Sequence, residues 1–380
     1  RDTWAKMLVG VNGGFQDPQE LDEYLAAGDC DLIAMARGLF ADEDYMEKCL
    51  TGRGDDIVPC IWCNKCHGTM TPPWISFCSV NPRLGIDPML LKTLPTGGAK
   101  KKVAIVGGGP IGMRAAMMAA EQGHQVTLFE KTDYLGGQLR HSDYVSFKWP
   151  LRDYKDYLVR QLDKHGITVR MNTLATPELL EQEGFEAVIA ATGAVPNIPK
   201  FAQDETGALK AGLKTCLDVF GHEDELGKRV IIVGGSETGV ETGMHLCEKG
   251  HEVTVLTRQD EIAHDASHLH AITMAIVTYD PKDYHEIIQC AWEKYPDFHS
   301  IVNATTTEVT EKTVCYTDEN GVSHTLEADS VVICGGMKAQ RDEALAFYGA
   351  APRFFMTGDC EKVANLQAGN RSAMGKVAQL

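Results

Sequence analysis

Four cysteines stand close together in one short segment and are the residues best suited to holding a metal. Cys60, Cys63 and Cys66 have the spacing C-x2-C-x2-C, and Cys78 follows them. Three thiolates at every third position of a loop can reach three corners of an iron–sulfur cubane, which a more distant fourth thiolate completes. Four thiolates also suit tetrahedral zinc, but zinc sites more often pair two C-x2-C knuckles. The spacing therefore favours a [4Fe–4S] cluster over zinc.

The other eight of the 12 cysteines are scattered singly along the chain. A secreted disulfide scaffold is short and loop-rich, and this chain is neither. We therefore expect a reducing compartment, a cytoplasmic location and one dedicated cysteine site.

A glycine-rich segment occurs twice and predicts two nucleotide-binding folds. Lys102–Gly112 recurs as Arg229–Gly239, and Glu121–Leu128 recurs at the same offset as Glu248–Val255. Each copy reads as an apolar strand, a glycine turn, a helix and a second strand, which is the dinucleotide-binding βαβ pattern. The turn places a pyrophosphate at the helix N-terminus, where free N–H groups and the helix dipole favour an anion. The turn residues expected to bind it are Gly107, Gly109 and Gly112 in the first copy and Gly234, Ser236 and Gly239 in the second.

The two copies differ at the position that reads the ribose. In the first copy the second strand ends at Glu130, which can accept hydrogen bonds from a ribose 2′-hydroxyl. In the second copy it ends at Thr257 and Arg258, and an arginine there can face a 2′-phosphate. The second site is therefore expected to bind NAD(P)H with a lean toward NADPH, although Ser236 adds a side chain near the pyrophosphate.

Three further segments favour a flavin at the first copy. Small residues follow Glu130 in the run LGGQL, an Ala-Thr-Gly turn ends another apolar strand, and a Gly-Asp pair ends a strand near the C-terminus. Together these resemble the flavoprotein disulfide-reductase fold, in which an NAD(P)H domain is inserted into a discontinuous FAD domain. The resemblance implies that Asp359 holds the ribityl chain of the flavin. The residues concerned are Gly137, Gln138, Thr192, Gly193, Gly358 and Asp359.

Residues 1–55 read as two strand–helix units with small residues at both strand ends. Gly13 and Gly14 follow the first strand, and Ala36 and Arg37 follow the second. This pattern matches the phosphate-binding end of a TIM barrel, which the loops after its last two strands form. The alternative is a βαβ fragment of the next domain, but the cysteine segment and a linker separate the two. A TIM barrel takes about 250 residues, so only its last two units are expected in this chain.

The order of these motifs resembles that of the multidomain old-yellow-enzyme relatives, which include bacterial 2,4-dienoyl-CoA reductase, enoate reductases and trimethylamine dehydrogenase. In that family the barrel holds FMN and the substrate site, so no substrate-level catalytic residue can be named here. The resemblance implies four cofactors: FAD, a [4Fe–4S] cluster, FMN and NAD(P)H. Matching positions imply which residues bind each group. The residues that would bind the FMN phosphate are Gly13, Gly14, Ala36 and Arg37, and those that would hold the cluster are Cys60, Cys63, Cys66 and Cys78. The residues that would bind FAD are Gly107, Gly109, Gly112, Glu130, Gly137, Gln138 and Asp359.

The resemblance also implies a route for electrons. NAD(P)H gives two electrons as hydride, FAD passes them singly to the cluster and then to FMN, and FMN reduces an activated C=C bond of an enoate or dienoyl-CoA. The competing prediction is an amine dehydrogenase similar to trimethylamine dehydrogenase, from which electrons leave to an electron-transfer flavoprotein. A non-catalytic, zinc-stapled nucleotide-binding module is the third alternative.

The expected fold is α/β, with a barrel end and two Rossmann-like domains of the disulfide-reductase type. We expect a barrel remnant in 1–55, the cluster segment and linker in 56–100, a discontinuous FAD domain in 101–215 and 339–380, and an NAD(P)H domain in 216–338. A chain of 380 residues is long enough for these parts.

Charge and hydropathy limit the partners. A formal charge of −17 argues against nucleic acid and anionic membrane, and no apolar run approaches the roughly 20 residues needed to cross a bilayer. The expected partners are a small-molecule substrate and a second copy of the chain. A preceding barrel segment is also expected, because the chain starts at Arg1 with neither an initiator Met nor a signal-peptide profile.

Overall fold

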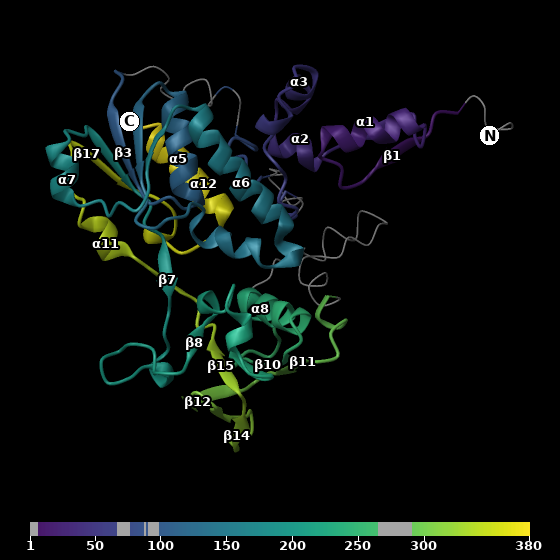
Figure 1. Cartoon of the computed structure of the whole chain (residues 1–380), viewed down its shortest axis with the longest axis vertical. Coiled ribbons are helices and arrows are strands. Elements are labelled where there is room, and N and C mark those ends of the chain that lie inside the picture. Colours follow the sequence, from purple (N-terminus) through teal and green to yellow (C-terminus); the bar gives the residue numbers. More distant parts are fainter. Residues whose placement is uncertain (1–6, 67–76, 87–88, 90–98, 265–290) are drawn as a thin grey trace. The chain divides into compact units, whose positions relative to one another are not determined.

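The chain forms two compact α/β units in a computed structural model that describes residues 7–66, 77–86, 89, 99–264 and 291–380 (Figure 1). The first unit combines the chain up to Ser142 with Phe147–Gly193 and Gln340–Leu380. The second unit combines Asp143–Ser146 with Ala194–Ala339. Parallel sheets lie at the centre of both units, which confirms the predicted fold class.

A five-stranded parallel sheet forms the centre of the first unit. Its strand order is β17–β6–β3–β4–β5. The strand β17 lies in the C-terminal segment, which follows the second unit in the sequence. It pairs with β6 and so completes this sheet. The strand bounds are Lys102–Val106 for β3, Gln125–Phe129 for β4, Thr168–Arg170 for β5, Ala187–Ala190 for β6 and Arg353–Met356 for β17.

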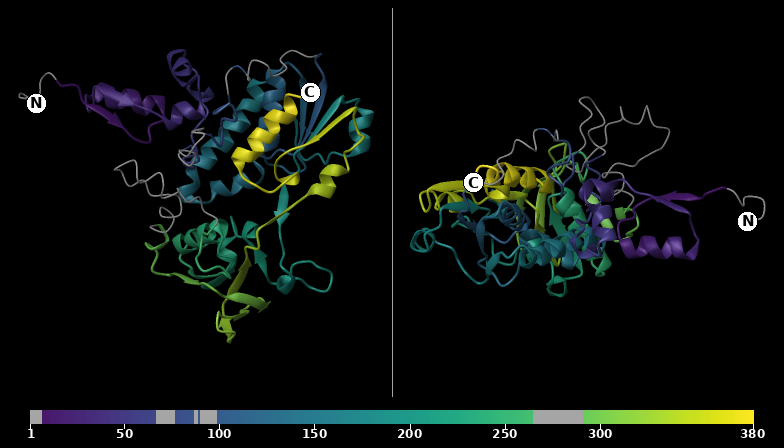
Figure 2. Two further views of the ribbon diagram at one scale, coloured as in Figure 1. Left: turned by 180° about the vertical axis from the view of Figure 1, so that it is seen from behind. Right: turned by 90° about the horizontal axis from the view of Figure 1, so that it is seen from above.

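Helices cover both faces of this sheet. On one face lie α5 (Pro110–Glu121), α6 (Trp149–Lys164) and α12 (Leu366–Val377), and α12 runs alongside α5 (Figure 2). On the other face lie α7 (Pro177–Gln182) and α11 (Arg341–Leu345). Three of these helices have a proline in their first turn, where the missing N–H costs nothing and the fixed φ favours a helix.

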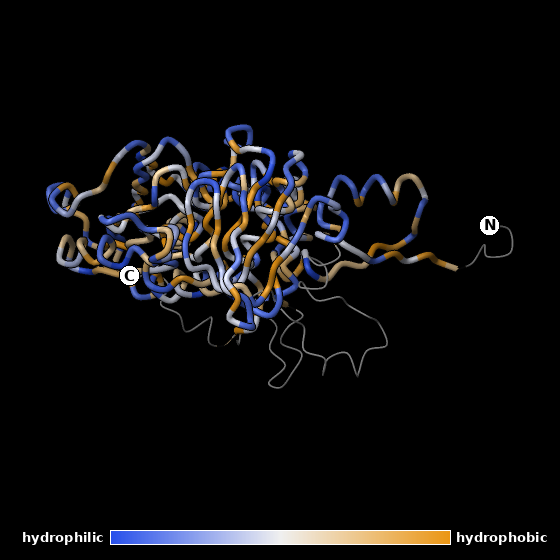
Figure 3. The backbone as a smooth tube through the Cα atoms, turned by 90° about the horizontal axis from the view of Figure 1, so that it is seen from below, coloured by the Kyte–Doolittle hydropathy of each residue, from blue (hydrophilic) through white to orange (hydrophobic). Residues whose placement is uncertain are grey.

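The N-terminal segment forms a small βα unit with little core of its own. The strands β1 (Gly10–Asn12) and β2 (Leu32–Ala34) pair in parallel, and α1 (Pro18–Ala27) lies between them in sequence. No residue of α1 is buried, and the hydrophobic chain that leads into β1 is exposed (Figure 3). Two short helices follow, α2 (Arg37–Ala41) and α3 (Tyr45–Leu50). A parallel strand pair is what the predicted barrel end requires, and its closure into a barrel stays a prediction.

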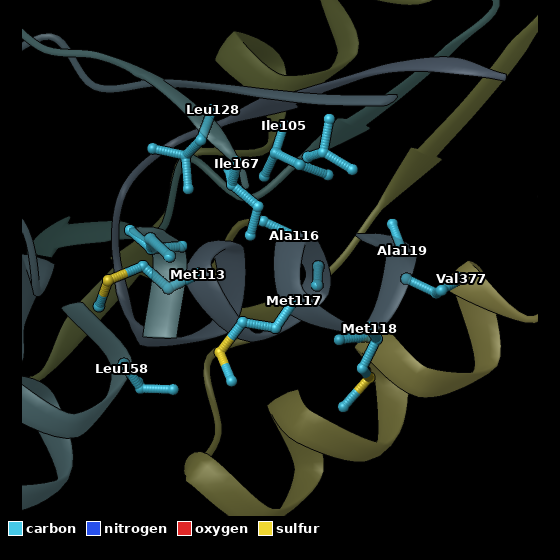
Figure 4. Close-up of a cluster of buried hydrophobic side chains, with 14 of the residues drawn as sticks. Ile105, Met113, Ala116, Met117, Met118, Ala119, Leu128, Leu158, Ile167 and Val377 are labelled. Carbon is cyan, nitrogen blue, oxygen red and sulfur yellow. The ribbon is translucent and has the colours of Figure 1, made fainter. Parts of the chain in front are cut away.

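The largest hydrophobic cluster lies between this sheet and its helices. Met113 and Met117 of α5 are at most 1% exposed, and Leu158 of α6 is wholly buried (Figure 4). Unbranched methionine side chains fill irregular gaps between neighbouring helices. Burying each such side chain stabilises the fold by about 1.5–3 kcal/mol, so α5 is held firmly under the glycine turn that precedes it.

Buried polar contacts fasten the cysteine segment to α6 and α12. Asn370 of α12 is wholly buried and donates through Nδ2 to the Ser79 carbonyl at 2.7 Å and to the Tyr154 hydroxyl at 3.3 Å. Gln161 of α6 donates through Nε2 to Asp56 Oδ1 at 3.0 Å. The segment on either side of the cysteines is therefore fixed to helices of the first unit.

The second unit repeats the parallel sheet and adds antiparallel strands. Its main sheet has the order β11–β10–β9–β15–β8, with α8 (Glu237–Glu248) after β9. Apolar side chains of β9 and β15 pack against those of β12 and β13. The bounds are Lys214–Thr215 for β8, Arg229–Val233 for β9, Glu252–Leu256 for β10, Phe298–Ile301 for β11, Thr305–Val309 for β12, Thr313–Thr317 for β13, Ser323–Glu327 for β14 and Ser330–Ile333 for β15.

The second unit begins at Ala194 rather than at the predicted position 216. The strand β7 (Ala194–Pro196) pairs with β16 (Met337–Ala339), and β8 forms the edge of the main sheet beside β15. Both pairings tie residues 194–215 to this unit. Strands of two or three residues are too short to show a hydrophobic period in the sequence, which explains the misplaced boundary.

Among the helices that the structure describes, none is long and apolar enough to cross a membrane. Even α6 has only 16 residues, fewer than the roughly 20 that a spanning helix needs.

We expect Gly112→Ala to destabilise the first unit, because a Cβ there would lie 1.9 Å from the Gly107 carbonyl oxygen. Overpacking of this kind costs about 1–3 kcal/mol. Gly375→Ala is the matched control, since a Cβ at that helical glycine meets nothing within 4 Å. Thermal unfolding should show a lower midpoint for Gly112→Ala only; an unchanged midpoint would mean that the turn can open to admit a side chain.

Candidate functional site

In the first glycine turn, Gly107 and Gly112 are packed closely against other backbone, whereas Gly109 faces open space. Gly107 has a φ of 112°, and a Cβ there would lie 2.4 Å from the Ala191 carbonyl oxygen. Gly112 is equally crowded by Gly107 itself. Gly109 differs, because a Cβ there meets only the Gly137 Cα, at 4.0 Å. Gly109 is the N-cap of α5, so the open space beside it adjoins free N–H groups that suit a pyrophosphate.

Glu130 at the end of β4 is built into this turn. Its side chain is buried, and Oε2 accepts a hydrogen bond from the Gly108 N–H at 2.8 Å. Oε1 accepts from both the N–H and the hydroxyl of Thr132, each at 2.8 Å. A carboxylate offers about four acceptor directions, so one remains for a ribose hydroxyl. The predicted ribose reader is therefore held in place beside the turn.

The predicted Gly137 lies against the same turn. It has a φ of 51°, and a Cβ there would lie 3.0 Å from the Gly109 Cα. The preceding Gly136 donates its N–H to the Gly108 carbonyl at 2.9 Å. Backbone therefore meets backbone without side chains between, as the close approach of a ring system requires. Gln138 follows within the short helix Gly137–Asp143.

Two other strand ends complete this edge of the sheet. Thr192 and Gly193 follow β6, and the Thr192 hydroxyl is buried without a hydrogen-bond partner in the described part of the chain. Gly358 and Asp359 follow β17, the neighbour of β6. Burial raises the pKa of the Asp359 carboxyl, and its Oδ1 accepts a hydrogen bond from the Ala364 N–H at 3.1 Å. An orphaned hydroxyl and a poorly solvated carboxyl fit a site that awaits a polar ligand.

The second unit reproduces the turn with one substitution. Gly234 has a φ of 119° and contacts the Cys334 carbonyl, while Gly239 packs on Gly234. Ser236 is the N-cap of α8 with φ −70° and ψ 172°, close to the −71° and 175° of Gly109. The serine is therefore accommodated without backbone strain.

The predicted reader of the second ribose lies at the surface. Thr257 is buried against Gly235, but Arg258 beside it is exposed. The exposed guanidinium is the group that we predict to face a 2′-phosphate.

A separate cavity lies at the N-terminal segment. Its volume is about 230 Å³, and it brings together the two predicted phosphate loops with part of the cysteine segment. The residues that line it include Gly13, Gly14, Ala36, Arg37, Cys60 and Trp62. All four residues predicted for the FMN phosphate therefore face one cavity, at the carboxyl ends of β1 and β2.

Trp62, which lines this cavity, and Asn64, which contacts Arg37, were not predicted. A Cβ at Gly14 would lie 2.0 Å from the Trp62 ring, so only glycine fits beneath it. The Arg37 guanidinium lies 5.1 Å from the centre of the same ring, and its Nη1 donates to Asn64 Oδ1 at 2.8 Å. Both Trp62 and Asn64 have positive φ values, of 58° and 54°. No local sequence signal marks a tryptophan in that conformation.

The four predicted cysteine ligands influence one another electrostatically. Burial and the neighbouring thiols raise the pKa of Cys66 to about 11, and burial raises the pKa of Cys60 and Cys78. The Cys63 Sγ lies 3.2 Å from the Ser79 hydroxyl. Within the described residues, however, no group of three or more His, Cys, Asp or Glu is arranged to hold a metal ion. The thiols are thus near one another without closing on a single ion.

Comparison with known proteins agrees with the two nucleotide folds. One matching family model is described as a pyridine nucleotide-disulphide oxidoreductase and covers residues 175–351; the other is a FAD dependent oxidoreductase at residues 102–148. A solved 2-naphthoyl-CoA reductase matches 100% of this chain and 56% of its own, with a TM-score of 0.87 and 29% identity. The chain belongs to the NADH:flavin oxidoreductases of the 2,4-dienoyl-CoA reductase type.

Curated relatives of this oxidoreductase extend the comparison. The NADH oxidase of Thermoanaerobacter brockii is 35% identical over 68% of this chain and 40% of its own length. The cinnamate reductase of Clostridium sporogenes is 30% identical over 93% of this chain and 50% of its own length. An N,N-dimethylglycine/sarcosine dehydrogenase of Chromohalobacter salexigens is a weaker match, 31% identical over 64% of this chain and 36% of its own length. The chain thus spans about half the length of the first relatives, 40–52%.

We expect Gly109→Val to fold and to lose FAD, because a Cβ there meets only the Gly137 Cα, at 4.0 Å, and the branched side chain would occupy the space in front of α5. Ser236→Val is the matched control, since its backbone angles are nearly the same but it lies at the second turn. It should keep FAD and bind NAD(P)H more weakly. Flavin absorbance per chain and nucleotide titration measure the two effects. Full flavin content in Gly109→Val would place the flavin elsewhere.

Proposed function

We propose that this oxidoreductase takes electrons from NAD(P)H at the second unit and passes them through FAD and a [4Fe–4S] cluster to FMN in a barrel. FAD exchanges two electrons with a nicotinamide and single electrons with a cluster, which is the chemistry these groups supply. The chain's own part is to bind and orient them. An activated C=C bond of an enoate or an enoyl-type thioester is the proposed final acceptor.

One observation carries this proposal: the cavity of the N-terminal segment is shared with the cysteine segment. Cys60 and Trp62 line it together with Arg37 and the glycines of the predicted phosphate loop. Ser79, just after Cys78, is fixed to α12 through Asn370. Contacts of Cys60 with the cavity and of Ser79 with α12 therefore support a cluster located between the predicted FMN and FAD sites.

The cavity has the chemistry of a phosphate site. Arg37 contacts Trp62 and Asn64, and no carboxylate of the described part of the chain forms an ion pair with it, so its charge is available to an anion. Gly13 has a φ of 150° and Gly14 lacks a side chain, which leaves backbone N–H groups accessible. A guanidinium and bare backbone amides are a common combination for binding phosphate.

The exposed apolar surface of the N-terminal segment supports the proposed barrel. Met7, Leu8 and Leu32 are 64%, 71% and 55% exposed, and all lie on or next to the two parallel strands. Parallel strands are almost always covered on both faces. We propose that the remaining strands and helices of the barrel cover these side chains and supply the residues that contact the substrate.

The proposed substrate class rests on the relatives. Cinnamate is an enoate, and 2-naphthoyl-CoA is a conjugated thioester; both names describe reductases. We therefore favour electron flow inward to a C=C bond over outward flow from an amine.

The cluster proposal predicts iron and acid-labile sulfide near about four of each per chain after anaerobic purification. Cys63→Ser should lose both and keep FAD, because the flavin fingerprint lies on other segments. Cys315→Ser is the control, since this thiol lies on β13 of the second unit. One zinc per chain with negligible iron would contradict the cluster and favour the zinc alternative.

The nucleotide preference depends on Arg258. A charge-assisted hydrogen bond to the 2′-phosphate contributes about 1.5–3 kcal/mol. Arg258→Ala should therefore weaken the binding of NADPH roughly tenfold to a hundredfold and leave the binding of NADH unchanged. Lys249→Ala, also exposed but at the far end of α8, is the control. The rate of FAD reduction at varied NADH and NADPH gives the ratio. An unchanged ratio would remove Arg258 as the reader and end the preference for NADPH.

A further inference from the structure

Two buried cysteines of the second unit lie opposite each other beside the glycine turn. The strands β8 and β15 pair in parallel, with Lys214 opposite Val332 and Thr215 opposite Ile333. Cys216, the first residue of a short helix, and Cys334 directly follow this last pair, so the register brings the two residues close together. The two are 4% and 5% exposed, and their thiols are hydrogen-bonded to each other.

The pairing geometry suits a covalent bond between them. Neighbouring strands lie about 4.7–4.9 Å apart, and disulfides join residues whose Cα atoms are about 4.4–6.8 Å apart. The two strand ends therefore already hold the cysteines near each other, and closing an S–S bond of about 2.05 Å draws the two residues together locally.

We propose that Cys216 and Cys334 are a redox-active dithiol whose oxidation to a disulfide weakens nucleotide binding at the second glycine turn. The disulfide is inferred from the pairing of the two strands and from the buried contact of the two thiols. Its effect on the nucleotide rests on the proposed function of the second unit.

Contact with Gly234 links the dithiol to the turn. A Cβ at Gly234 would lie 2.1 Å from the Cys334 carbonyl oxygen, and one at Gly239 would lie 3.6 Å from the Cys334 Cβ. The Cys334 N–H also donates to the Val233 carbonyl at 2.8 Å, at the residue just before the turn. With so little free space, a shift of Cys334 toward Cys216 must move the backbone that faces the pyrophosphate.

The hydrogen bond also assigns roles to the two thiols. Donation from Cys334 lowers the pKa of Cys216, while the same bond and burial raise the pKa of Cys334. Cys216 is therefore the one that reacts as thiolate. The oxidant must be small, because both thiols are buried, and we take it to be a hydroperoxide.

The reaction balances in two steps. The Cys216 thiolate attacks one peroxide oxygen, the O–O bond breaks, and hydrogen peroxide yields a sulfenic acid and hydroxide. The Cys334 sulfur then attacks the Cys216 sulfur, the S–O bond breaks, and the hydroxyl leaves with the Cys334 proton as water. Two thiols have lost two electrons to the peroxide. An external dithiol restores them by exchange.

Peptide mapping of the whole chain tests the disulfide. The reduced protein is treated with hydrogen peroxide, its remaining thiols are alkylated, and the digest is searched for a linked pair. We expect a Cys216–Cys334 peptide that disappears on treatment with dithiothreitol and persists in the control Cys247→Ser. If no linked peptide forms in the wild type, the proposal is wrong, whatever any variant does.

Titration with NADP⁺ and NAD⁺ tests the consequence, because these oxidised forms bind without reducing a flavin. After peroxide treatment, the wild type should bind at least roughly fivefold more weakly, the lower end of usual coupling between sites. Cys334→Ala should keep its affinity under the same treatment. A linked peptide with unchanged affinity would overturn the proposed effect. If the reduced protein binds neither nucleotide, the proposed function fails, while the peptide map still decides the disulfide.

Discussion

The buried amide of Asn370 is the contact on which the proposed electron route depends. It joins the Ser79 carbonyl, next to the fourth cysteine, to the Tyr154 hydroxyl and to α12 under the flavin-type sheet. A buried polar group that loses its partner costs about 1–3 kcal/mol, so the cysteine segment cannot drift from the sheet without penalty. Transfer of single electrons requires a short and fixed distance between the groups that exchange them. This polar contact holds the cysteine segment at a fixed position relative to the sheet.

The two glycine turns have the same backbone conformation and packing, although they are predicted to bind different nucleotides. In each, the third glycine packs on the carbonyl of the first, and the first packs on the carbonyl of a residue that follows a neighbouring strand. That residue is Ala191 in the first unit and Cys334 in the second. The scaffold is thus conserved between the copies, while the residues at the ribose and the middle of the turn differ. Of the three residues at the predicted ribose positions, Glu130 and Thr257 are buried against their turns, whereas Arg258 is exposed and can change without disturbing the fold.

Much of this architecture could be predicted from the sequence, because its signals are local. The repeated strand–turn–helix pattern and the spacing of glycines determine the two parallel sheets, and the strand ends bring Glu130, Thr192 and Asp359 to one edge. Long-range features had no such signal. The boundary at Ala194 depends on strands of two or three residues, the wall formed by Trp62 depends on a positive φ, and the meeting of Cys216 with Cys334 depends on a register between strands far apart in sequence.

We propose that electrons from the nucleotide reach the cysteine segment through the flavin. The decisive experiment is an anaerobic titration with NADPH, followed by flavin absorbance and by the paramagnetic signal of a reduced iron–sulfur cluster. We expect the flavin to be reduced and the cluster signal then to rise in the same protein. A flavin that is fully reduced while no cluster signal develops would contradict it.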